Sequence, residues 1–371
     1  MKKKKIDVIT LHRIVNYGSV LQAYATQAVL TQKGYEVEFI DYYPERMHML
    51  GMLKRIKNKS NLLRRNILVR TVARIIMLPS YIQRFGVFKK FLKKYLKMTP
   101  KTYQTEEELE EDIPQADIYC TGSDQVWNTG WNEKIDYPFF LEFVPKNKKC
   151  IAIAASFGKS ELEDWEKEET KELLSKYSAL SMRELSGVKI AKDLGFEDAI
   201  NILDPTLLLN GEEWSQLASD KYSNQDYVFV YNLNRNKKID AYVQKLAKEK
   251  KLKIYYVSYC LHEFYKKGKM KCNVKVEDFL SLIKNAKYVV TDSFHATAFS
   301  INFNTQFMIV FPEKYSTRVE SILKITGLEE RIVKDCNNTQ LMDSIIDFSD
   351  ANKILNEQRK IAYKYIESVL K

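Results

Sequence analysis

The sequence predicts an α/β protein in which two parallel-sheet domains face a cleft. Short apolar runs rich in β-branched residues alternate with helical patterns along the chain, which is typical of strands joined by crossover helices. The alternation falls into two series, separated by a hinge at Asp204-Pro205 that continues through Gly211 and Trp214. A length of 371 residues also exceeds one ordinary hydrophobic core and suits two domains.

The first series predicts a sheet domain over residues 1–210. Short apolar runs predict strands at 6–10, 37–40, 117–121, 151–155, 180–182 and 200–203. Apolar residues at helical spacing predict helices at 20–30, at 163–176 and after Arg183. Gly34 follows the first of these helices as a stop signal.

The second series predicts another sheet domain over residues 222–349. The same patterns predict strands at 227–233, 254–257, 288–291 and 307–310. Helices are expected between these strands at 237–250, 276–285 and 294–302. A helix at about 317–325 and a long terminal helix at 350–370 complete the chain.

The formal net charge of +11 is concentrated in residues 47–98. This segment contains fourteen Lys and Arg and no Asp or Glu, so the rest of the chain carries a formal charge of −3. A slightly acidic remainder does not favour a nucleic-acid-binding protein. Apolar residues recur among the basic ones at helical intervals, which predicts a basic amphipathic helical insertion. Such an insertion either presents a solvated face or lies on an anionic membrane surface.

Cysteine usage and hydrophobicity predict the compartment. Five scattered cysteines form no C-x-x-C pair and no His/Cys cluster at zinc spacing, so we expect reduced thiols and no metal site. The lysines at 2–5 precede a short segment that Asp7 interrupts, which is not a signal-peptide core. No apolar run approaches the roughly 18 residues of a membrane-spanning helix. We expect a cytoplasmic protein, soluble or peripheral at the inner face of the membrane.

The most informative segment is 288–301, in which an apolar run ends at Asp292-Ser293 and a helical pattern begins. Ligands of open α/β sheets bind at such strand ends, where free helix-start N–H groups face the crevice. His295 lies in the first turn of the helix and is one of only four histidines. The alternative is a helix cap beside a buried, hydrogen-bonded histidine.

Three further polar segments follow predicted strands. Their chemistry suits a sugar and an anion: amides, hydroxyls and an indole in two of them, and a fork-shaped guanidinium in the third. The alternative is an ordinary turn for the segment that begins at Gly122, and a surface ion pair for the segment that contains Arg183. Arg318 likewise allows either an anion-binding or a structural role. The segments are Asn16-Tyr17-Gly18-Ser19, Gly122-Ser123-Asp124-Gln125-Val126-Trp127-Asn128 and Ser181-Met182-Arg183-Glu184.

These segments together resemble the polysaccharide pyruvyl transferase family over most of the chain. The order and spacing of the matching motifs make the resemblance specific; besides the four above they include Ile40-Asp41-Tyr42, Ala154-Ala155-Ser156-Phe157-Gly158 and Leu203-Asp204-Pro205-Thr206. The resemblance implies a GT-B-like fold of two Rossmann-like domains, with the last helix crossing back, so that 350–371 joins 1–210. It also implies transfer of pyruvate from phosphoenolpyruvate to a sugar, giving a cyclic ketal and phosphate.

The resemblance also places the site residues. The family's donor-binding arginine falls on Arg183 and its histidine on His295. Members with an Arg-x-His motif have an arginine where this chain has Ser293, and many relatives have glycine where it has Ala296. Arg318 is the candidate to replace the missing cation.

We therefore expect His295 to be the catalytic acid/base and no metal or cofactor to be needed besides the donor substrate, phosphoenolpyruvate. The expected donor-binding residues are Arg183, Asp292, Ser293 and Arg318. The expected acceptor-binding residues are Asn16, Tyr17, Gly18, Ser123, Asp124, Gln125 and Trp127.

The expected partners are a sugar acceptor of polysaccharide (exopolysaccharide or capsule) synthesis, which we expect to be lipid-linked, and an anionic membrane surface through 47–98. Three alternatives differ in measurable products or binding. A GT-B glycosyltransferase using a sugar nucleotide would release a nucleoside diphosphate. A non-catalytic scaffold would bind no donor, and a nucleic-acid binder would lose affinity steeply with salt.

Overall fold

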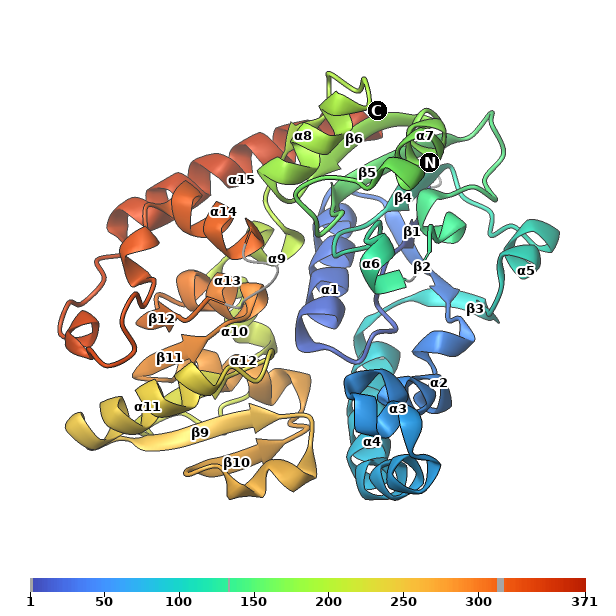
Figure 1. The fold of residues 1–371 in the computed structure, drawn as a ribbon. Helices are drawn as coiled ribbons and strands as arrows, with labels where there is room; N and C mark the ends of the chain where they lie inside the picture. Colours follow the sequence, from blue (N-terminus) through green and yellow to red (C-terminus); the bar gives the residue numbers. More distant parts are fainter. Residues whose placement is uncertain (1–2, 133, 312–316) are drawn as a thin grey trace.

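The computed structural model contains two parallel sheets, which confirms the predicted α/β fold class (Figure 1). It describes residues 3–132, 134–311 and 317–371. The first sheet has seven strands in the order β3-β2-β1-β4-β5-β6-β7, and the second has five in the order β10-β9-β8-β11-β12. Helices connect successive strands, as parallel pairing requires.

The first sheet spans the N-terminal half of the chain. Its central strands are fully buried, because helices cover both faces. The strands are β1 (Lys5–Ile9), β2 (Glu36–Tyr42), β3 (Met98–Tyr103), β4 (Ile118–Thr121), β5 (Lys149–Ala155), β6 (Tyr177–Met182) and β7 (Ile200–Asn201). The helices outside residues 47–98 are α1 (Tyr17–Gln32), α5 (Glu106–Glu111), α6 (Thr129–Asn132), α7 (Asp164–Leu174) and α8 (Leu185–Asp193).

The second sheet begins after two short helices, α9 (Pro205–Leu208) and α10 (Gly211–Leu217), which occupy the expected hinge. Its strands are β8 (Tyr227–Tyr231), β9 (Lys253–Ser258), β10 (Lys269–Cys272), β11 (Tyr288–Thr291) and β12 (Phe307–Ile309). Its helices are α11 (Lys237–Glu249), α12 (Val276–Lys284), α13 (Phe294–Asn302) and α14 (Thr317–Thr326).

Two edge strands were not expected from the sequence. Both β3 and β10 are short and rich in lysine and other polar residues, so neither shows the apolar run by which a strand is recognised. Each forms by pairing with one neighbour, β2 or β9, and charged residues are common on such edges.

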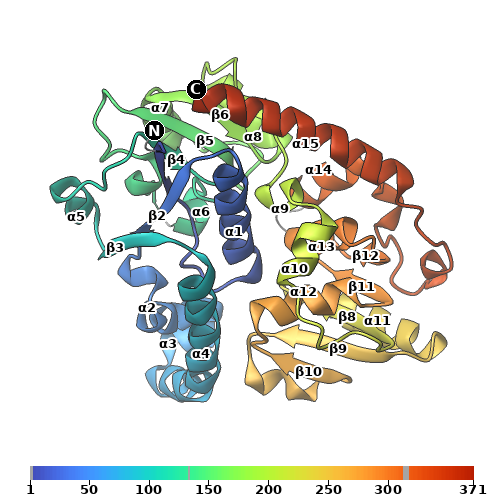
Figure 2. The same cartoon turned by 180° about the vertical axis from the view of Figure 1, so that it is seen from behind.

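The last helix, α15 (Ser349–Leu370), crosses from the second domain back to the first (Figure 2). It buries Leu355, Ile366 and Leu370. The Tyr35 hydroxyl donates to the carbonyl of Leu370 at 2.8 Å, which fixes the end of α15 on the first domain. The chain therefore has the GT-B-like arrangement that the sequence resemblance implied.

Residues 47–98 contain the helices α2 (Met49–Lys54), α3 (Asn61–Arg65) and α4 (Ile67–Tyr95). The centre of α4 packs against the second domain: the Ser80 hydroxyl accepts from the Leu261 amide at 3.0 Å, and the Ser80 carbonyl accepts from Asn273 Nδ2 at 3.1 Å. This helix therefore belongs to the cleft wall. Among the described residues, no helix is both long and apolar enough to cross a bilayer.

Candidate functional site

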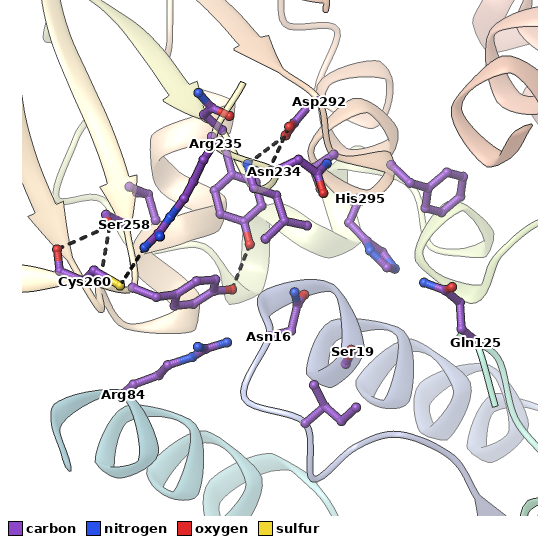
Figure 3. Close-up of a pocket in the computed structure, with 18 of the residues that line it drawn as sticks. Asn16, Ser19, Arg84, Gln125, Asn234, Arg235, Ser258, Cys260, Asp292 and His295 are labelled. Carbon is purple, nitrogen blue, oxygen red and sulfur yellow. Dashed lines mark hydrogen bonds between the residues drawn. The ribbon is translucent and has the colours of Figure 1, made fainter. Parts of the chain in front are cut away.

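A cavity of about 700 Å³ lies between the two domains (Figure 3). Its walls come from loops at the carboxyl ends of strands in both sheets and from α2 and α4, so distant parts of the sequence meet there. From the first domain it is lined by Asn16, Ser19, Arg84, Asp124, Gln125 and Asn128, and from the second by Asn232, Asn234, Arg235, Tyr259, Asp292, Ser293, His295 and Arg318.

His295 lies in the first turn of α13, where the sequence placed it. Ser293 is the N-cap of this helix, and its hydroxyl accepts from the Ala296 amide at 3.5 Å. The imidazole points toward the first domain (Figure 3) and packs against Gly18 at the start of α1. A Cβ atom at position 18 would lie 2.0 Å from His295 Nδ1, so only glycine fits.

The His295 imidazole is uncharged at neutral pH. Burial lowers its pKa to about 4, although the carboxylates of Asp204 and Asp124 act in the opposite direction. Its Nε2 atom is buried and has no hydrogen-bond partner among the residues that the structure describes. A buried ring nitrogen without a partner is costly in a core and is more typical of a site that binds a ligand.

Arg183 is enclosed beneath the cavity. Its Nη1 atom lies 3.0 Å from Asp204 Oδ2, its Nη2 atom 3.6 Å from Asp124 Oδ1, and its side chain is 1% exposed. Phe294 covers the guanidinium, with its ring centre 5.1 Å from Cζ. In this structure Arg183 therefore holds carboxylates in place, and its direct contact with the donor stays a prediction.

Asp124 connects this ion-pair network to the cavity. Burial alone would raise its pKa, but Arg183, His295 and a 2.6 Å hydrogen bond from the Ser19 hydroxyl keep the pKa below its usual value. Asp124 also adopts a φ of 76°, which is uncommon for a residue other than glycine and is frequent at functional sites. Asp124 therefore presents a charged carboxylate at the cavity.

Arg318, at the start of α14, presents a guanidinium to the cavity. Its Nε atom is buried and, within the described parts of the chain, has no hydrogen-bond partner. Burial, with the nearby charge of Arg183, lowers its pKa to about 10, so it remains charged at neutral pH. The side-chain amide of Gln125 lies between Arg318 and Asn128. One of its terminal atoms is 3.2 Å from both terminal nitrogens of Arg318, and the other is 2.6 Å from Asn128 Nδ2. Arg318 and Gln125 therefore meet from opposite domains.

Asp292 has a structural role that the sequence did not indicate. Its carboxylate accepts from the amides of Leu233 at 2.7 Å and Asn234 at 2.9 Å, and so shapes the loop after β8 (Figure 3). Its pKa is raised by burial. Although Asp292 lines the cavity, this carboxylate is engaged with the backbone. Asp292 therefore supports the loop in this structure, and its expected contact with the donor stays a prediction.

Three of the expected acceptor-binding residues lie in the interior. Trp127 is 1% exposed, and its indole N–H donates to the Phe139 carbonyl at 3.0 Å. Tyr17 is fully buried, and Ser123 donates to Asp204. Their polar atoms are engaged within the protein, so in this structure the three side chains support the cavity wall from behind, and their contact with an acceptor stays a prediction. Asn16, Gly18, Asp124 and Gln125 do reach the cavity region.

Several cavity residues were missed by sequence reasoning. Tyr259 lies just after β9, and the Arg84 guanidinium stacks on its ring at 3.7 Å from the centre. Asn234 and Arg235 follow β8. For Tyr259, Asn234 and Arg235 the available signal was their position after a strand. Arg84 gave no such signal, because it lies among many other basic residues in 47–98.

Cys260, His262 and Glu263 lie close enough to share an ion, with ligand atoms within 4.8 Å of one another. Arg235 already pairs with two of them: its Nη2 atom lies 3.3 Å from Cys260 Sγ and 2.9 Å from Glu263 Oε1. A guanidinium in this position supplies the positive charge, so the group does not fit a metal cation.

Comparison with known proteins gives a family and a fold. The model of the polysaccharide pyruvyl transferase family matches residues 16–311. No protein of curated function matches the sequence. A Listeria monocytogenes protein assigned as a UDP-N-acetylglucosamine 2-epimerase is similar in structure, with a TM-score of 0.54, 10% identity and coverage of 99% of this chain and 95% of that chain.

A second similar structure is that of S. aureus MnaA with UDP, with a TM-score of 0.51, 11% identity and coverage of 98% of this chain and 90% of that one. A third, a UDP-N-acetylglucosamine 2-epimerase, has a TM-score of 0.52 and 12% identity, and covers 100% of this chain and 96% of its own. At this identity the likeness shows a shared fold.

Proposed function

Because the chain belongs to the polysaccharide pyruvyl transferase family, we propose that it transfers the pyruvyl group of phosphoenolpyruvate to two hydroxyls of one sugar. The acceptor is a unit of a polysaccharide or of its lipid-linked precursor. The products are a cyclic pyruvate ketal and inorganic phosphate.

One observation carries the proposal: His295, uncharged and with an unpartnered nitrogen, lies beside Arg318 where the N-termini of α1 and α13 meet. The first N–H groups of a helix lack carbonyl partners, and the helix dipole favours anions there. Phosphoenolpyruvate carries both a carboxylate and a phosphate. A neutral base next to an anion site suits the attack of a hydroxyl on such a donor.

Arg318 is the donor-binding cation in this scheme. Arg183 lies beneath Phe294 and pairs with Asp124 and Asp204, whereas Arg318 lines the cavity itself. Ser293 supplies a hydroxyl and a helix start but no charge. Arg318 therefore takes the place of the arginine found in relatives with an Arg-x-His motif, from a different element of the fold.

The proton balance of the reaction fits a single neutral histidine. His295 takes the proton of the attacking sugar hydroxyl and delivers it to the methylene carbon of the donor, which becomes a methyl group. The hydroxyl oxygen bonds to the adjacent carbon. The second hydroxyl then replaces the phosphate, and its proton leaves with the phosphate. Binding of the donor dianion favours the protonated imidazole, because an opposite charge raises its pKa.

The rest of the cavity serves the acceptor. A volume of about 700 Å³ exceeds the needs of a three-carbon donor. Tyr259 offers an aromatic face, and Asn16, Asn232 and Asn234 offer amides of the kind that pair with sugar hydroxyls. In this acceptor lobe Tyr259 lies beside α4, because Arg84 of that helix stacks on its ring, and Figure 3 shows Arg84 on the far side of Asn16 from His295.

A His295→Asn variant tests the site. Asparagine keeps polar atoms but cannot carry the proton, so phosphate release from phosphoenolpyruvate in the presence of acceptor should fall by at least about 10²-fold. The same variant should still bind phosphoenolpyruvate in a thermal-shift titration, because Arg318 is intact. A rate within a few-fold of wild type would refute the role of His295.

A further inference from the structure

Exposed apolar side chains are concentrated in one part of the molecule, the insertion at 47–98. Among the described residues, sixteen large apolar side chains are exposed, and nine of them lie in this insertion. They include Leu68 at 75% exposure and Ile75 at 64%. The nine are Leu50, Leu62, Ile67, Leu68, Val69, Val72, Ile75, Ile76 and Ile82. Clusters of this kind on a soluble surface mark interaction sites.

The helix α4 has two apolar faces in its N-terminal half and centre. Leu68, Val72, Ile75 and Ile76 recur at spacings of three and four residues, so they form one continuous stripe on the helix. This stripe is exposed, while the buried residues of α4, including Met77, Tyr81 and Phe88, pack onto the protein. One face therefore completes the cleft wall, and the other has no partner among the described residues.

The charge around the stripe has a single sign. Residues 47–98 contain fourteen Lys and Arg and no Asp or Glu. Arg64 and Arg65, in the last turn of α3, are exposed and precede the stripe by a few residues in the chain. The same charge would oppose the packing of a second copy of this surface, whereas it favours a negatively charged partner.

We propose that this surface, formed by the exposed residues of α3 and the N-terminal half of α4, docks on an anionic lipid bilayer. An amphipathic helix with an apolar stripe flanked by Lys and Arg lies in the headgroup region of such membranes. Its apolar side chains enter the acyl boundary, and its cations contact the lipid headgroups. We name it the docking surface. It lies at the far end of the insertion from the first sheet (Figure 1).

The docking surface is continuous with the cavity, because one helix forms both. Met77, Tyr81 and Arg84 follow the stripe in α4 and line the cavity wall. Arg84 also donates to the carbonyl of Val15 at 2.7 Å, beside the start of α1. A sugar carried on a membrane lipid would therefore reach the acceptor lobe along α4. This consequence rests on the proposed function, whereas bilayer binding does not.

Flotation of the full chain with lipid vesicles tests the inference. We expect binding to vesicles of phosphatidylcholine and phosphatidylglycerol, and little binding to phosphatidylcholine alone. Ile75→Asp should weaken binding roughly tenfold or more, since it removes an apolar side chain that enters the acyl boundary when the protein is bound. Arg64→Gln with Arg65→Gln should weaken it by an order of magnitude or more, because each cation contributes about 1 kcal/mol near an anionic surface.

The matched control is Ile345→Asp, which changes an isoleucine of 77% exposure outside the insertion. It should leave vesicle binding unchanged. Equal binding to neutral vesicles, or unchanged binding by the Ile75→Asp and arginine variants, would overturn the inference. Self-association that Ile75→Asp abolishes in the absence of vesicles, seen by light scattering, would instead identify a second copy as the occupant and also overturn it.

Activity assays separate this inference from the proposed function. With a soluble sugar acceptor, Ile75→Asp should retain wild-type turnover; with the acceptor embedded in anionic vesicles, turnover should fall with binding. If vesicles bind but phosphoenolpyruvate is never consumed, the proposed function fails and the docking surface stands. If turnover on both acceptors is equal in wild type and variant while flotation is lost, the delivery role fails alone.

Discussion

Gly18 at the start of α1 and His295 at the start of α13 pack so closely that a Cβ atom on Gly18 would lie 2.0 Å from His295 Nδ1. The two residues are 277 positions apart and belong to different domains. Their contact fixes the imidazole in the cleft and depends on how the domains meet. The position of the proposed acid/base is therefore set by a residue that takes no part in the chemistry.

Replacement of Gly18 by alanine should displace the imidazole. We expect turnover to fall by about 10²-fold, because an ångström-scale misplacement of a catalytic group has effects of this size. Overpacking should also lower the free energy of unfolding by about 1–3 kcal/mol. Gly86→Ala is the control: an added Cβ there meets no atom within 4 Å, so activity should be retained. Wild-type turnover in Gly18→Ala would contradict the proposed position of His295.

Replacement of Arg318 by glutamine should weaken donor binding. A hydrogen bond to a charged group contributes about 1.5–3 kcal/mol, so KM for phosphoenolpyruvate should rise roughly 10- to 100-fold. Arg318→Lys keeps the charge and should recover part of this loss. Steady-state kinetics at fixed acceptor measures both. An unchanged KM in Arg318→Gln would show that another group holds the phosphate.

Replacement of Arg183 by glutamine should act on stability first. It leaves the carboxylates of Asp124 and Asp204 buried without their partner, and breaking such a pair typically costs about 3–5 kcal/mol. Adding Asp204→Asn should restore part of the stability, because one unpaired charge is removed. Chemical denaturation of the two variants measures this. Full stability with a raised KM would instead favour direct contact between Arg183 and the donor.

The pKa of His295 predicts a pH-dependent part of the stability. The folded protein holds the imidazole unprotonated down to pH about 4, whereas the unfolded chain takes up the proton near its ordinary pKa of 6.5. Between these values the unfolded state binds more protons, so stability falls as pH falls from 6.5 to 4. The expected loss is about 3 kcal/mol.

The difference between wild type and His295→Gln isolates this contribution, because other groups titrate in the same range. Asp7, for example, has a pKa raised by burial to about 6, which acts with the opposite sign. Near and above pH 6.5 the unfolding free energies of the two proteins should change with pH in the same way. Below pH 6.5 the unfolding free energy of wild type should fall more steeply than that of His295→Gln. Parallel profiles from pH 6.5 to 4 would show that His295 is not held neutral by burial.

The sequence predicted the fold well because its strands carry strong local patterns. The run Tyr-Val-Val-Thr at 288–291 and its helix start at Ser293 appear in the structure where they were expected. The edge strands β3 and β10 were missed because pairing, and not an apolar pattern, defines them. An apolar pattern predicts that a strand is buried within a sheet, but it does not predict which further strand pairs at the edge of that sheet.

The site was predicted less completely, since exposure is decided by tertiary packing. Trp127 and Arg183 follow strands as ligand-binding residues do. In the fold, however, Phe140 packs on the Trp127 ring and Phe294 covers Arg183. His295 was assigned to a strand end that does line the cavity. Tyr259 and Arg84 come together from separate domains, so no local signal could have joined them.

The donor is the central claim, and one measurement tests it most directly: identification of the product released when the purified chain is given a sugar acceptor with phosphoenolpyruvate or with UDP-sugars. We predict inorganic phosphate from phosphoenolpyruvate, in equal amount to a new ketal methyl group on the sugar, and none without acceptor. Release of UDP from a UDP-sugar, with phosphoenolpyruvate left intact, would contradict the account.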